Sequence, residues 1–472
     1  MGQTAFEKIW NAHRVAELGD GTDLILVDRV LLHERTGGVA LKSLADSGRQ
    51  VNDPAQVFAT MDHIVDTLPN RSDYTIMPTG RDFILATREA SEAAGITLFD
   101  LHDPRQGIVH VISPELGIIL PGATLVCPDS HTCSQGALGG LAWGIGSSEA
   151  EHVLATSTLR VNKPKTMRVT ITGKLSPGVT AKDLALYIIS EVGSAGAVGH
   201  LLEYAGEAVS DLEVEARLTL CNMATELGAF TAFIAPDEKV FSYLKGRDYA
   251  PKGAEWDLAV SQWKEIFSDD DAVFDRDITI AGEDVPPMVS WGVSPQQAAP
   301  IDGPVPQFED VSSRDSREIY DRALSYMALE AGLPLSAVPI DAAFIGSCTN
   351  SRMSDLRRAA ALLKGRKVAP HVKAICVPGS TAVKKRAEEE GLDKIFLEAG
   401  FEWRESGCSM CFFAGGESFG AEERVVTSTN RNFESRQGPK TRSHLASPET
   451  VAASAIFGHI ADARLLAKES VQ

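Results

Sequence analysis

The chain has 472 residues, of which 44% are hydrophobic and 23% are charged, a composition typical of a globular protein that excludes a largely disordered one. This length predicts about three domains, and no apolar run approaches the roughly 20 residues that cross a bilayer. The formal net charge of −19 argues against nucleic acid as a general partner, because phosphate binding needs a surplus of lysine and arginine.

The cysteines and the N-terminal residues indicate the cellular compartment in which the protein is expected to act. Seven cysteines, an odd number, occur in a chain whose residues 1–12 lack the basic and then apolar pattern of an export signal. We therefore expect a cytoplasmic protein with free thiols or metal ligands instead of disulfides, and no membrane association. An acidic protein still binds an anionic substrate where arginines gather locally, and four do so here: Arg424, Arg431, Arg436 and Arg442.

Short apolar strands in the first part of the chain lead directly into polar clusters. Residues 57–61 precede Asp62-His63, and residues 123–127 precede Asp129-Ser130-His131. Two glycine pairs follow, but Glu149 stands where the third glycine of a dinucleotide-binding loop belongs. The glycines therefore predict close backbone packing and not a nucleotide site.

A new unit is predicted to begin near residue 163. Residues 167–172 alternate apolar and polar side chains, and Thr180 with Asp183 resembles a capping box ahead of an apolar helix. The clearest linker is 294–315, which is rich in Pro, Gln, Ser and Asp. No internal repeat is visible.

The C-terminal part alternates strands and helices with short connections. Strands are predicted over 342–345 and 372–377, and helices over 354–364 and 381–390, each helix followed by a glycine. This order predicts an α/β fold, with parallel sheets that carry helices on their faces.

Four polar clusters each follow a predicted strand, and they are Asp62-His63, Asp129-Ser130-His131, Cys348 and Asn430-Arg431. Because parallel sheets collect ligands at the carboxyl ends of their strands, we expect these clusters to converge. The alternative is that strand-to-helix loops are polar whatever their function.

Three cysteines lie in two loops. Cys408 and Cys411 form a C-x-x-C pair, and Cys348 lies upstream in a Gly-Ser-Cys-Thr-Asn loop. A C-x-x-C pair fits a redox pair, half of a zinc site or half of a cluster site. A structural zinc site needs four ligands, whereas three thiolates leave one iron of a [4Fe–4S] cluster open as a Lewis acid. On spacing alone, small buried cysteines without a function remain an alternative.

Seven short motifs, in the same order, resemble those of the aconitase superfamily. Three of them are Gly346-Ser347-Cys348-Thr349-Asn350, Gly407-Cys408-Ser409-Met410-Cys411 and Thr429-Asn430-Arg431-Asn432-Phe433. The other four are Asp62-His63, Gly107-Ile108-Val109-His110, Asp129-Ser130-His131-Thr132 and Cys221-Asn222-Met223-Ala224-Thr225-Glu226. The match covers essentially the whole chain and lies closest to the large subunits of the isopropylmalate enzymes. So many ordered motifs exclude an incidental grouping of cysteines.

The resemblance implies three α/β/α domains, with parallel or mixed sheets, around a central [4Fe–4S] cleft. We expect them over 1–162, 163–293 and 294–472, with the last domain following the linker. The swivelling fourth domain of single-chain aconitases is expected to be absent and to be supplied by a separate small subunit. We therefore expect this chain to be active only with that partner.

The resemblance also implies the site residues. Cys348, Cys408 and Cys411 are expected to hold one [4Fe–4S] cluster with one iron open to substrate. Three histidine–carboxylate pairs are expected around it, namely His63 with Asp62, His110 with Asp129 and His131 with Glu226, and His63 is expected to protonate the leaving hydroxyl. The expected substrate-binding residues are Arg431, Arg436, His33, Ser130, Asn222 and Asn430.

The implied activity is that of a hydro-lyase that interconverts 2-isopropylmalate and 3-isopropylmalate in leucine biosynthesis. Local departures from the family pattern, such as Arg35, Pro128, Ser435 and the stretch 412–416, keep maleate, citraconate and 2-methylmalate as alternative substrates. Alternatives of a different class are a cluster-based sensor or RNA-binding protein, which the negative charge disfavours, and a structural zinc protein.

Overall fold

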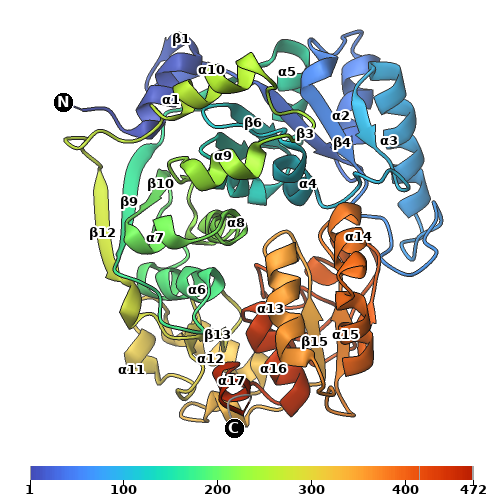
Figure 1. Ribbon diagram of the computed structural model, residues 1–472, viewed down its shortest axis with the longest axis vertical. Helices are drawn as coiled ribbons and strands as arrows, with labels where there is room; N and C mark the ends of the chain where they lie inside the picture. The colour runs from blue at the N-terminus through green and yellow to red at the C-terminus, as the bar shows by residue number, and fades with distance from the viewer. Residues whose placement is uncertain (1, 414, 470–472) are drawn as a thin grey trace. The chain divides into compact units, whose positions relative to one another are not determined.

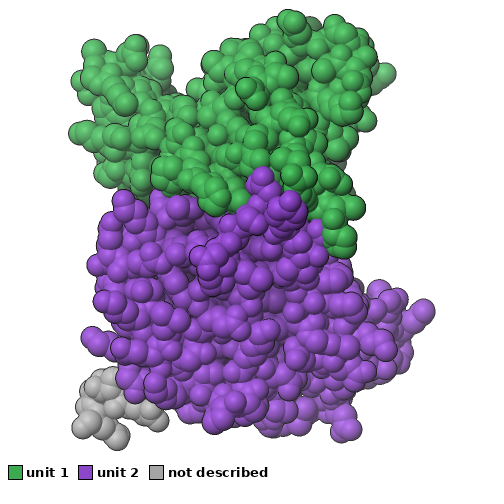
Figure 2. Space-filling view, turned by 90° about the vertical axis from the view of Figure 1, so that its right-hand side faces the viewer, with its two compact units in different colours: residues 1–64, 78–174, 197–281 green, residues 65–77, 175–196, 282–472 purple. Residues whose placement is uncertain are grey.

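The computed structural model describes residues 2–413 and 415–469, and the chain divides into two compact units (Figure 2). Unit 1 comprises residues 1–64, 78–174 and 197–281, and unit 2 comprises residues 65–77, 175–196 and 282–472. Each unit thus draws on separate stretches of the chain, and the three-domain division expected from the sequence remains a prediction.

The main sheet of unit 1 has five parallel strands in the order β5-β4-β3-β6-β7. Their bounds are β3 Arg29–His33, β4 Val57–Thr60, β5 Thr97–Phe99, β6 Thr124–Cys127 and β7 Leu141–Gly144. The chain winds outward from β3 in one direction and outward from β6 in the other. The carboxyl ends of β3 and β6 therefore flank a topological switch point, where open α/β sheets bind their ligands.

Unit 1 contains two further sheets. One is parallel, in the order β11-β10-β9-β12, and the other is antiparallel, in the order β1-β2-β8. Their bounds are β1 Arg14–Gly19, β2 Thr22–Leu26, β8 Thr158–Asn162, β9 Lys165–Thr172, β10 His200–Ala205, β11 Thr231–Phe233 and β12 Arg276–Ala281. The alternation predicted over 167–172 is thus part of a strand, β9.

Helices cover the sheets of unit 1, and α2 packs against both α3 and α5 (Figure 1). The α-helices are α1 Ala5–His13, α2 Gly37–Asp46, α3 Gly80–Ala94, α4 Val109–Leu116, α5 Ser147–Thr156, α7 Glu207–Asp211, α8 Val214–Asn222, α9 Glu238–Leu244 and α10 Ala254–Trp263. The 3-10 helices are η1 Pro54–Gln56, η2 Ser130–Leu138 and η3 Met223–Leu227. Apolar side chains from α1, α2 and the five-stranded sheet form one buried core.

Unit 2 repeats the doubly wound plan. Its main sheet is parallel, in the order β17-β16-β15-β18-β19, so that a second switch point lies between β15 and β18. The bounds are β15 Ala342–Ile345, β16 Lys373–Cys376, β17 Phe401–Trp403, β18 Arg424–Thr427 and β19 Arg442–Leu445, with an antiparallel pair, β13 Met288–Ser290 and β14 Ala298–Pro300.

Helix α13 packs against α15 and α16 beside this sheet (Figure 1). The helices of unit 2 are α6 Ala181–Val192, η4 Gly282–Asp284, α11 Phe308–Val311, α12 Arg317–Met327, η5 Leu335–Ala337, α13 Met353–Leu363, α14 Thr381–Glu389, α15 Leu392–Ala399, η6 Ser409–Cys411, α16 Pro448–Phe457 and α17 Arg464–Glu469. None of the described helices combines the length and the apolar character that crossing a membrane requires.

Local signals explain several boundaries. Thr180 and Asp183 form the expected capping box at the start of α6, and the Ser380 side chain caps α14. The stretch 294–315, expected as a linker, contains β14 and α11, and it places Ile301 and Val305 in the core of unit 2. This stretch therefore contributes to the packing of that unit.

Candidate active site

In unit 1, polar side chains gather beside the switch point. His33 is the last residue of β3, Asp62 and His63 follow β4, and Asp129 follows β6. The strand-and-loop pattern of the sequence predicted such polar groups at Asp62-His63 and at Asp129, whereas His33 was expected from the family resemblance alone. The short buried strands, β4 and β6 among them, hold these loops on one edge of the sheet.

Asp129 connects three imidazoles. Its Oδ1 lies 3.0 Å from His110 Nε2 and 3.6 Å from His131 Nδ1, and its Oδ2 lies 3.3 Å from His63 Nε2. Oδ1 also accepts the backbone N–H of His131 at 2.7 Å. Burial raises the pKa of this carboxyl, but hydrogen bonds and charge interactions with His110, together with those to His131 and His63, outweigh burial and hold the pKa well below its usual range. Asp129 is therefore a carboxylate at neutral pH.

His63 is held between two carboxylates. Its Nδ1 lies 2.6 Å from Asp62 Oδ1, while its Nε2 faces Asp129. Asp62 is fully buried and also accepts the backbone N–H of Val109 at 2.8 Å. Burial raises the pKa of Asp62, but the charge and the hydrogen bond of His63 lower it by more than burial raises it. The pKa of Asp62 therefore lies below its usual value. With Nδ1–H donating to Asp62, the ring orientation is fixed and Nε2 is the nitrogen available for proton exchange.

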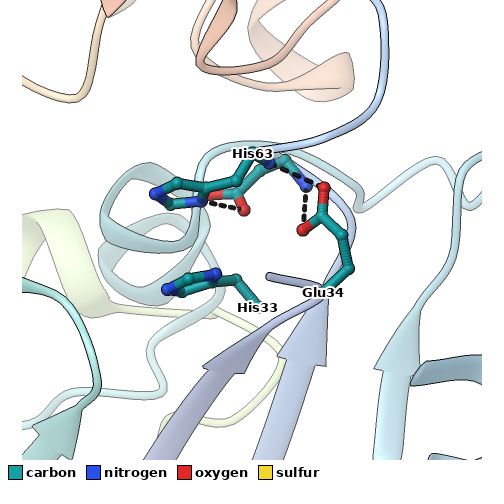
Figure 3. Close-up of side chains that lie close together, drawn as sticks. His33, Glu34 and His63 are labelled. Carbon is teal, nitrogen blue, oxygen red and sulfur yellow. Dashed lines mark hydrogen bonds and ion pairs between the residues drawn. The ribbon is translucent and has the colours of Figure 1, made fainter. Parts of the chain in front are cut away.

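His33 stacks on His63, with ring centroids 3.9 Å apart and planes inclined by 18° (Figure 3). Its Nε2 lies 3.3 Å from the carbonyl oxygen of Pro128, and its buried Nδ1 has no hydrogen-bond partner. Burial, followed by the charge of His63, lowers the pKa of His33 to about 4, so that the ring is neutral at pH 7. A neutral imidazole with a free nitrogen suits contact with a bound ligand.

Glu34 was not predicted as a site residue, yet it supports the loop that carries His63. Its carboxyl group is buried and accepts the backbone N–H groups of Asp62, His63 and Ile64, at 3.0, 2.8 and 2.5 Å. Figure 3 shows the Glu34 side chain beside His63. Burial, reinforced by the charge of Asp62, raises the pKa of Glu34 to about 7.

Ligand atoms of His33, Glu34, Asp62 and His63 lie within 4.8 Å of one another. The oxygens of Glu34 are already occupied by backbone donors, so this residue supports the loop and is a poor cation ligand. A signal was present, because Glu34 directly follows a predicted site residue.

The third expected pair is also in contact. His131 Nε2 lies 3.1 Å from Glu226 Oε1, and both side chains are buried. Asn222, at the end of α8, donates its amide N–H to Ser134 Oγ at 2.9 Å, and Ser130 is exposed. The structure thus brings each predicted histidine to its predicted carboxylate, while the roles of these residues in a reaction remain predictions.

In unit 2, two loops meet at the switch point between β15 and β18. The Ser428 hydroxyl donates to the carbonyl oxygen of Gly346 at 3.0 Å and accepts the N–H of the same residue at 3.0 Å. The buried Lys182 ammonium donates to the carbonyl oxygens of Ser428, at 2.8 Å, and Thr429. The loop that carries Cys348 is therefore tied to the loop that carries Asn430.

The three motif cysteines are buried, form no disulfide in the described part of the chain, and lie on these loops and on the loop around η6. The Asn430 amide lies between two of them, with Nδ2 3.4 Å from Cys348 Sγ and Oδ1 3.6 Å from Cys411 Sγ, and Ser347 Oγ lies 3.1 Å from Cys411 Sγ. Three buried sulfur donors with an amide beside them are a donor set that fits an iron–sulfur cluster.

The other four cysteines differ in their surroundings. Burial raises the pKa of the Cys127, Cys221 and Cys376 thiols well above the usual value, so that they stay protonated and ligate poorly. Cys133 lies within η2. Cys221 lies one residue before the end of α8.

The four gathered arginines separate into two groups. Arg424 and Arg442 face each other across β18 and β19 and serve the fold, since Arg424 is buried and donates to the carbonyl oxygen of Met327 at 2.6 Å. Burial and the neighbouring charge of Arg442 lower the pKa of Arg424 to about 10. The expectation of one basic patch is corrected accordingly, because the strand register places these two in structural roles.

Arg431 and Arg436 remain as candidates for anion binding. Arg431 is half-buried, and Arg436 is buried with its guanidinium 4.5 Å from the Phe412 ring centroid and 5.1 Å from that of Phe433. The buried Arg436 Nε has no hydrogen-bond partner. A carboxylate would satisfy this donor, because the planar guanidinium binds carboxylates through paired N–H groups.

Comparison with known proteins shows the family to which the chain belongs. The family model described as "Aconitase family (aconitate hydratase)" matches residues 7–458, and the chain therefore belongs to the aconitase family. Enzymes of this family carry a [4Fe–4S] cluster.

Among curated proteins, the chain is 50% identical over 465 residues to 3-isopropylmalate dehydratase large subunit 1 of Bradyrhizobium diazoefficiens. That match covers 98% of this chain and 97% of the relative. Among solved structures, proline utilization A from Corynebacterium freiburgense matches at 12% identity over 93% of this chain and 50% of that one. Its TM-score of 0.14 is too low to carry any argument.

Proposed function

We propose that this chain is the large subunit of a hydro-lyase that interconverts 2-isopropylmalate and 3-isopropylmalate by dehydration and rehydration, a step of leucine biosynthesis. The observation that carries the proposal is the 50% identity to a 3-isopropylmalate dehydratase large subunit along nearly the full length of both chains. The histidine–carboxylate pairs of unit 1 and the three buried thiols of unit 2 are the groups that such a reaction needs.

In this proposal Cys348, Cys408 and Cys411 hold one [4Fe–4S] cluster. When bound, it supplies an iron without a protein ligand, which acts as a Lewis acid toward the hydroxyl and a carboxylate of the substrate. The Asn430 amide, which contacts the thiols of Cys348 and Cys411, would fix their orientation.

The proton transfers are assigned to the imidazoles. His63 protonates the departing hydroxyl from Nε2, because its Nδ1–H is held by Asp62. Asp129 keeps His63 and His110 in place and stays negatively charged itself. His131 is oriented by Glu226 in the same way.

The substrate is held by its carboxylates. Arg436 offers a buried, unpartnered Nε, and Arg431 lies five positions earlier on the same loop. His33, neutral and with a free Nδ1, and the exposed Ser130 are further contacts that we propose in unit 1. We propose Asn222 as another, and its amide is held by Ser134.

We further propose that a small subunit carrying a swivelling domain supplies the base that removes the Cα proton. The support is the printed name of the relative, which is a large subunit. We also propose a cytoplasmic location, which is favoured by seven cysteines that form no disulfide in the described residues, because disulfides form mainly in exported proteins.

The test is substrate profiling of the full chain co-expressed with a candidate small subunit from the same genome. The pair should turn over 2-isopropylmalate with a higher kcat/KM than maleate, citraconate or 2-methylmalate. Preference for one of the latter would keep the hydro-lyase chemistry but replace the substrate. A cluster-loaded pair that hydrates none of the corresponding unsaturated acids would contradict the proposal.

A further inference from the structure

A buried network of polar side chains lies beside the cysteine pair of unit 2, and Glu417 is at its centre. Its carboxylate accepts hydrogen bonds from the Thr67 backbone N–H at 3.2 Å, the Thr67 hydroxyl at 2.8 Å and the Ser409 hydroxyl at 2.5 Å. Arg404 NH1 lies 3.3 Å away. All four side chains are buried, so this carboxylate is surrounded by fixed donors instead of water.

The contact with Ser409 bears directly on the cysteines. Ser409 follows Cys408 within the C-x-x-C pair, and its φ of +48° lies in the left-handed region that residues with a side chain adopt at a cost. The neighbouring turn is closed by the Cys411 N–H, which donates to the carbonyl oxygen of Cys408 at 3.0 Å. A hydrogen bond on the Ser409 side chain therefore acts on the backbone that sets the spacing of two thiols.

The other side of the network is fixed to the sheet. The Arg404 N–H donates to the carbonyl oxygen of Cys376, at the end of β16, at 3.1 Å. The Glu405 N–H donates to the carbonyl oxygen of Thr67 at 2.8 Å. Glu417 thus connects the cysteine turn to residues 404–405, directly through Arg404, which is bonded to the end of β16, and through Thr67, which is bonded to Glu405.

We infer that Glu417 is a positioning residue that holds Cys408 and Cys411 ready for the cluster. The inference rests on the proposed function for the identity of the cluster. Glu417 acts through Ser409, whose left-handed backbone it stabilises, and its loss would free the turn without removing a ligand. Retention of the cluster therefore depends on a carboxylate that lies outside the cysteine motifs.

A simpler role, neutralising the buried Arg404, does not account for the arrangement. Glu402 Oε2 already accepts from Arg404 Nε at 3.0 Å and from NH2 at 2.6 Å, so the guanidinium keeps a carboxylate partner without Glu417. The Thr67 and Ser409 hydroxyls, in contrast, both donate to Glu417.

The experiment compares the full chain with Glu417→Gln and Ser409→Ala, each reconstituted anaerobically with iron and sulfide. A chelator is then added, and the loss of absorbance at about 400 nm is followed over time. Both variants should lose the cluster about tenfold faster than the parent, the size of effect typical of groups that orient metal ligands. The matched control is Glu434→Gln, which breaks an ion pair with Arg322 on an exposed surface of the same unit and should leave the rate unchanged.

A second readout needs no cluster. In the apoprotein, alkylation of Cys408 and Cys411, measured by mass spectrometry, should be faster in both variants than in the parent, while alkylation of Cys376 should not change. If the Glu417 variant does not fold, the Ser409 variant tests the inference by itself, because it removes a single hydroxyl and is expected to fold. A folded variant with parental rates of cluster loss and alkylation would overturn the inference. A parent chain that takes up no iron would instead refute the proposed function, and the alkylation rates would still decide the role of Glu417.

Discussion

At the scale of single residues, Asp129 makes the most consequential contacts of unit 1, because one carboxylate faces His63, His110 and His131. We predict that Asp129→Asn lowers kcat by about 10²–10⁴, the range for lost acid–base catalysis, since an amide cannot accept from all of these donors. The measurement is kcat of the two-subunit enzyme at matched cluster content. Asp28→Asn, at the separate Asp28–His13 pair of unit 1, is the control and should leave kcat unchanged. Equal rates for both variants would exclude Asp129 from the mechanism.

Glu34 leads to a prediction about pH. Its pKa is raised to about 7 in the fold, so the folded state holds a proton that the unfolded chain has released above about pH 4.5. The stabilisation is therefore complete below pH 4.5 and is lost as the pH rises to 7, a change of up to about 3 kcal/mol.

Glu34→Gln imitates the protonated form and should remove this pH dependence, whereas Glu34→Ala leaves three buried N–H groups without an acceptor and should cost about 3 kcal/mol. The measurement is the thermal midpoint of the parent and both variants between pH 5 and 8. Identical pH profiles for the parent and Glu34→Gln would show that Glu34 is ionised throughout.

At the scale of elements, local signals predicted much of the fold. The strand over 342–345, the cap of α6 and the polar loops after β4 and β6 were all visible as short-range patterns. The positions of His63 and Cys348 at strand ends could be predicted for the same reason, and the histidine–carboxylate pairs came from the resemblance to the aconitase superfamily.

What could not be predicted depends on long-range pairing. The register of β18 with β19 places Arg424 opposite Arg442, and this turns an apparent basic patch into a structural pair. The contacts of Glu417 with Thr67 join residues 350 positions apart. No local pattern encodes such contacts, because they arise only when separate stretches of the chain pack together.

Gly144, the last residue of β7, leads to a prediction at the scale of elements. A Cβ added at Gly144 would lie 2.6 Å from the carbonyl oxygen of Asp129, so Gly144→Ala must displace the loop after β6. We expect kcat to fall by about tenfold to a hundredfold, the effect of a small misplacement of reacting groups, with a stability cost of about 1–3 kcal/mol.

Gly146→Ala is the matched control. The nearest atom to its added Cβ would be Glu149 Oε2 at 3.6 Å, which is an ordinary contact. Both variants are compared by kcat and by thermal midpoint. If Gly144→Ala were as active as Gly146→Ala, close packing of β7 would not be what positions Asp129.

At the scale of the whole molecule, the two units carry different chemistry. The histidine–carboxylate pairs belong to unit 1, and Cys348, Cys408, Cys411 and both candidate arginines belong to unit 2. Each unit gathers its groups at the switch point of its own doubly wound sheet. A duplicated architectural plan thus provides acid–base groups in one unit and thiols in the other.

This division predicts which part of the chain responds to removal of the cluster. A ligand that binds only the folded state stabilises the elements that hold it, and the proposed ligands all lie on loops of unit 2. Chelation should therefore raise amide hydrogen exchange in 346–350, 407–411 and 428–431, and leave β3, β4 and β6 of unit 1 protected. The measurement is hydrogen exchange by mass spectrometry on loaded and chelated protein. A Cys408→Ser variant treated in the same way serves as the control, because its exchange should already match the chelated parent. Equal deprotection of both units would mean that the cluster stabilises the entire chain and not the loops that carry the three cysteines.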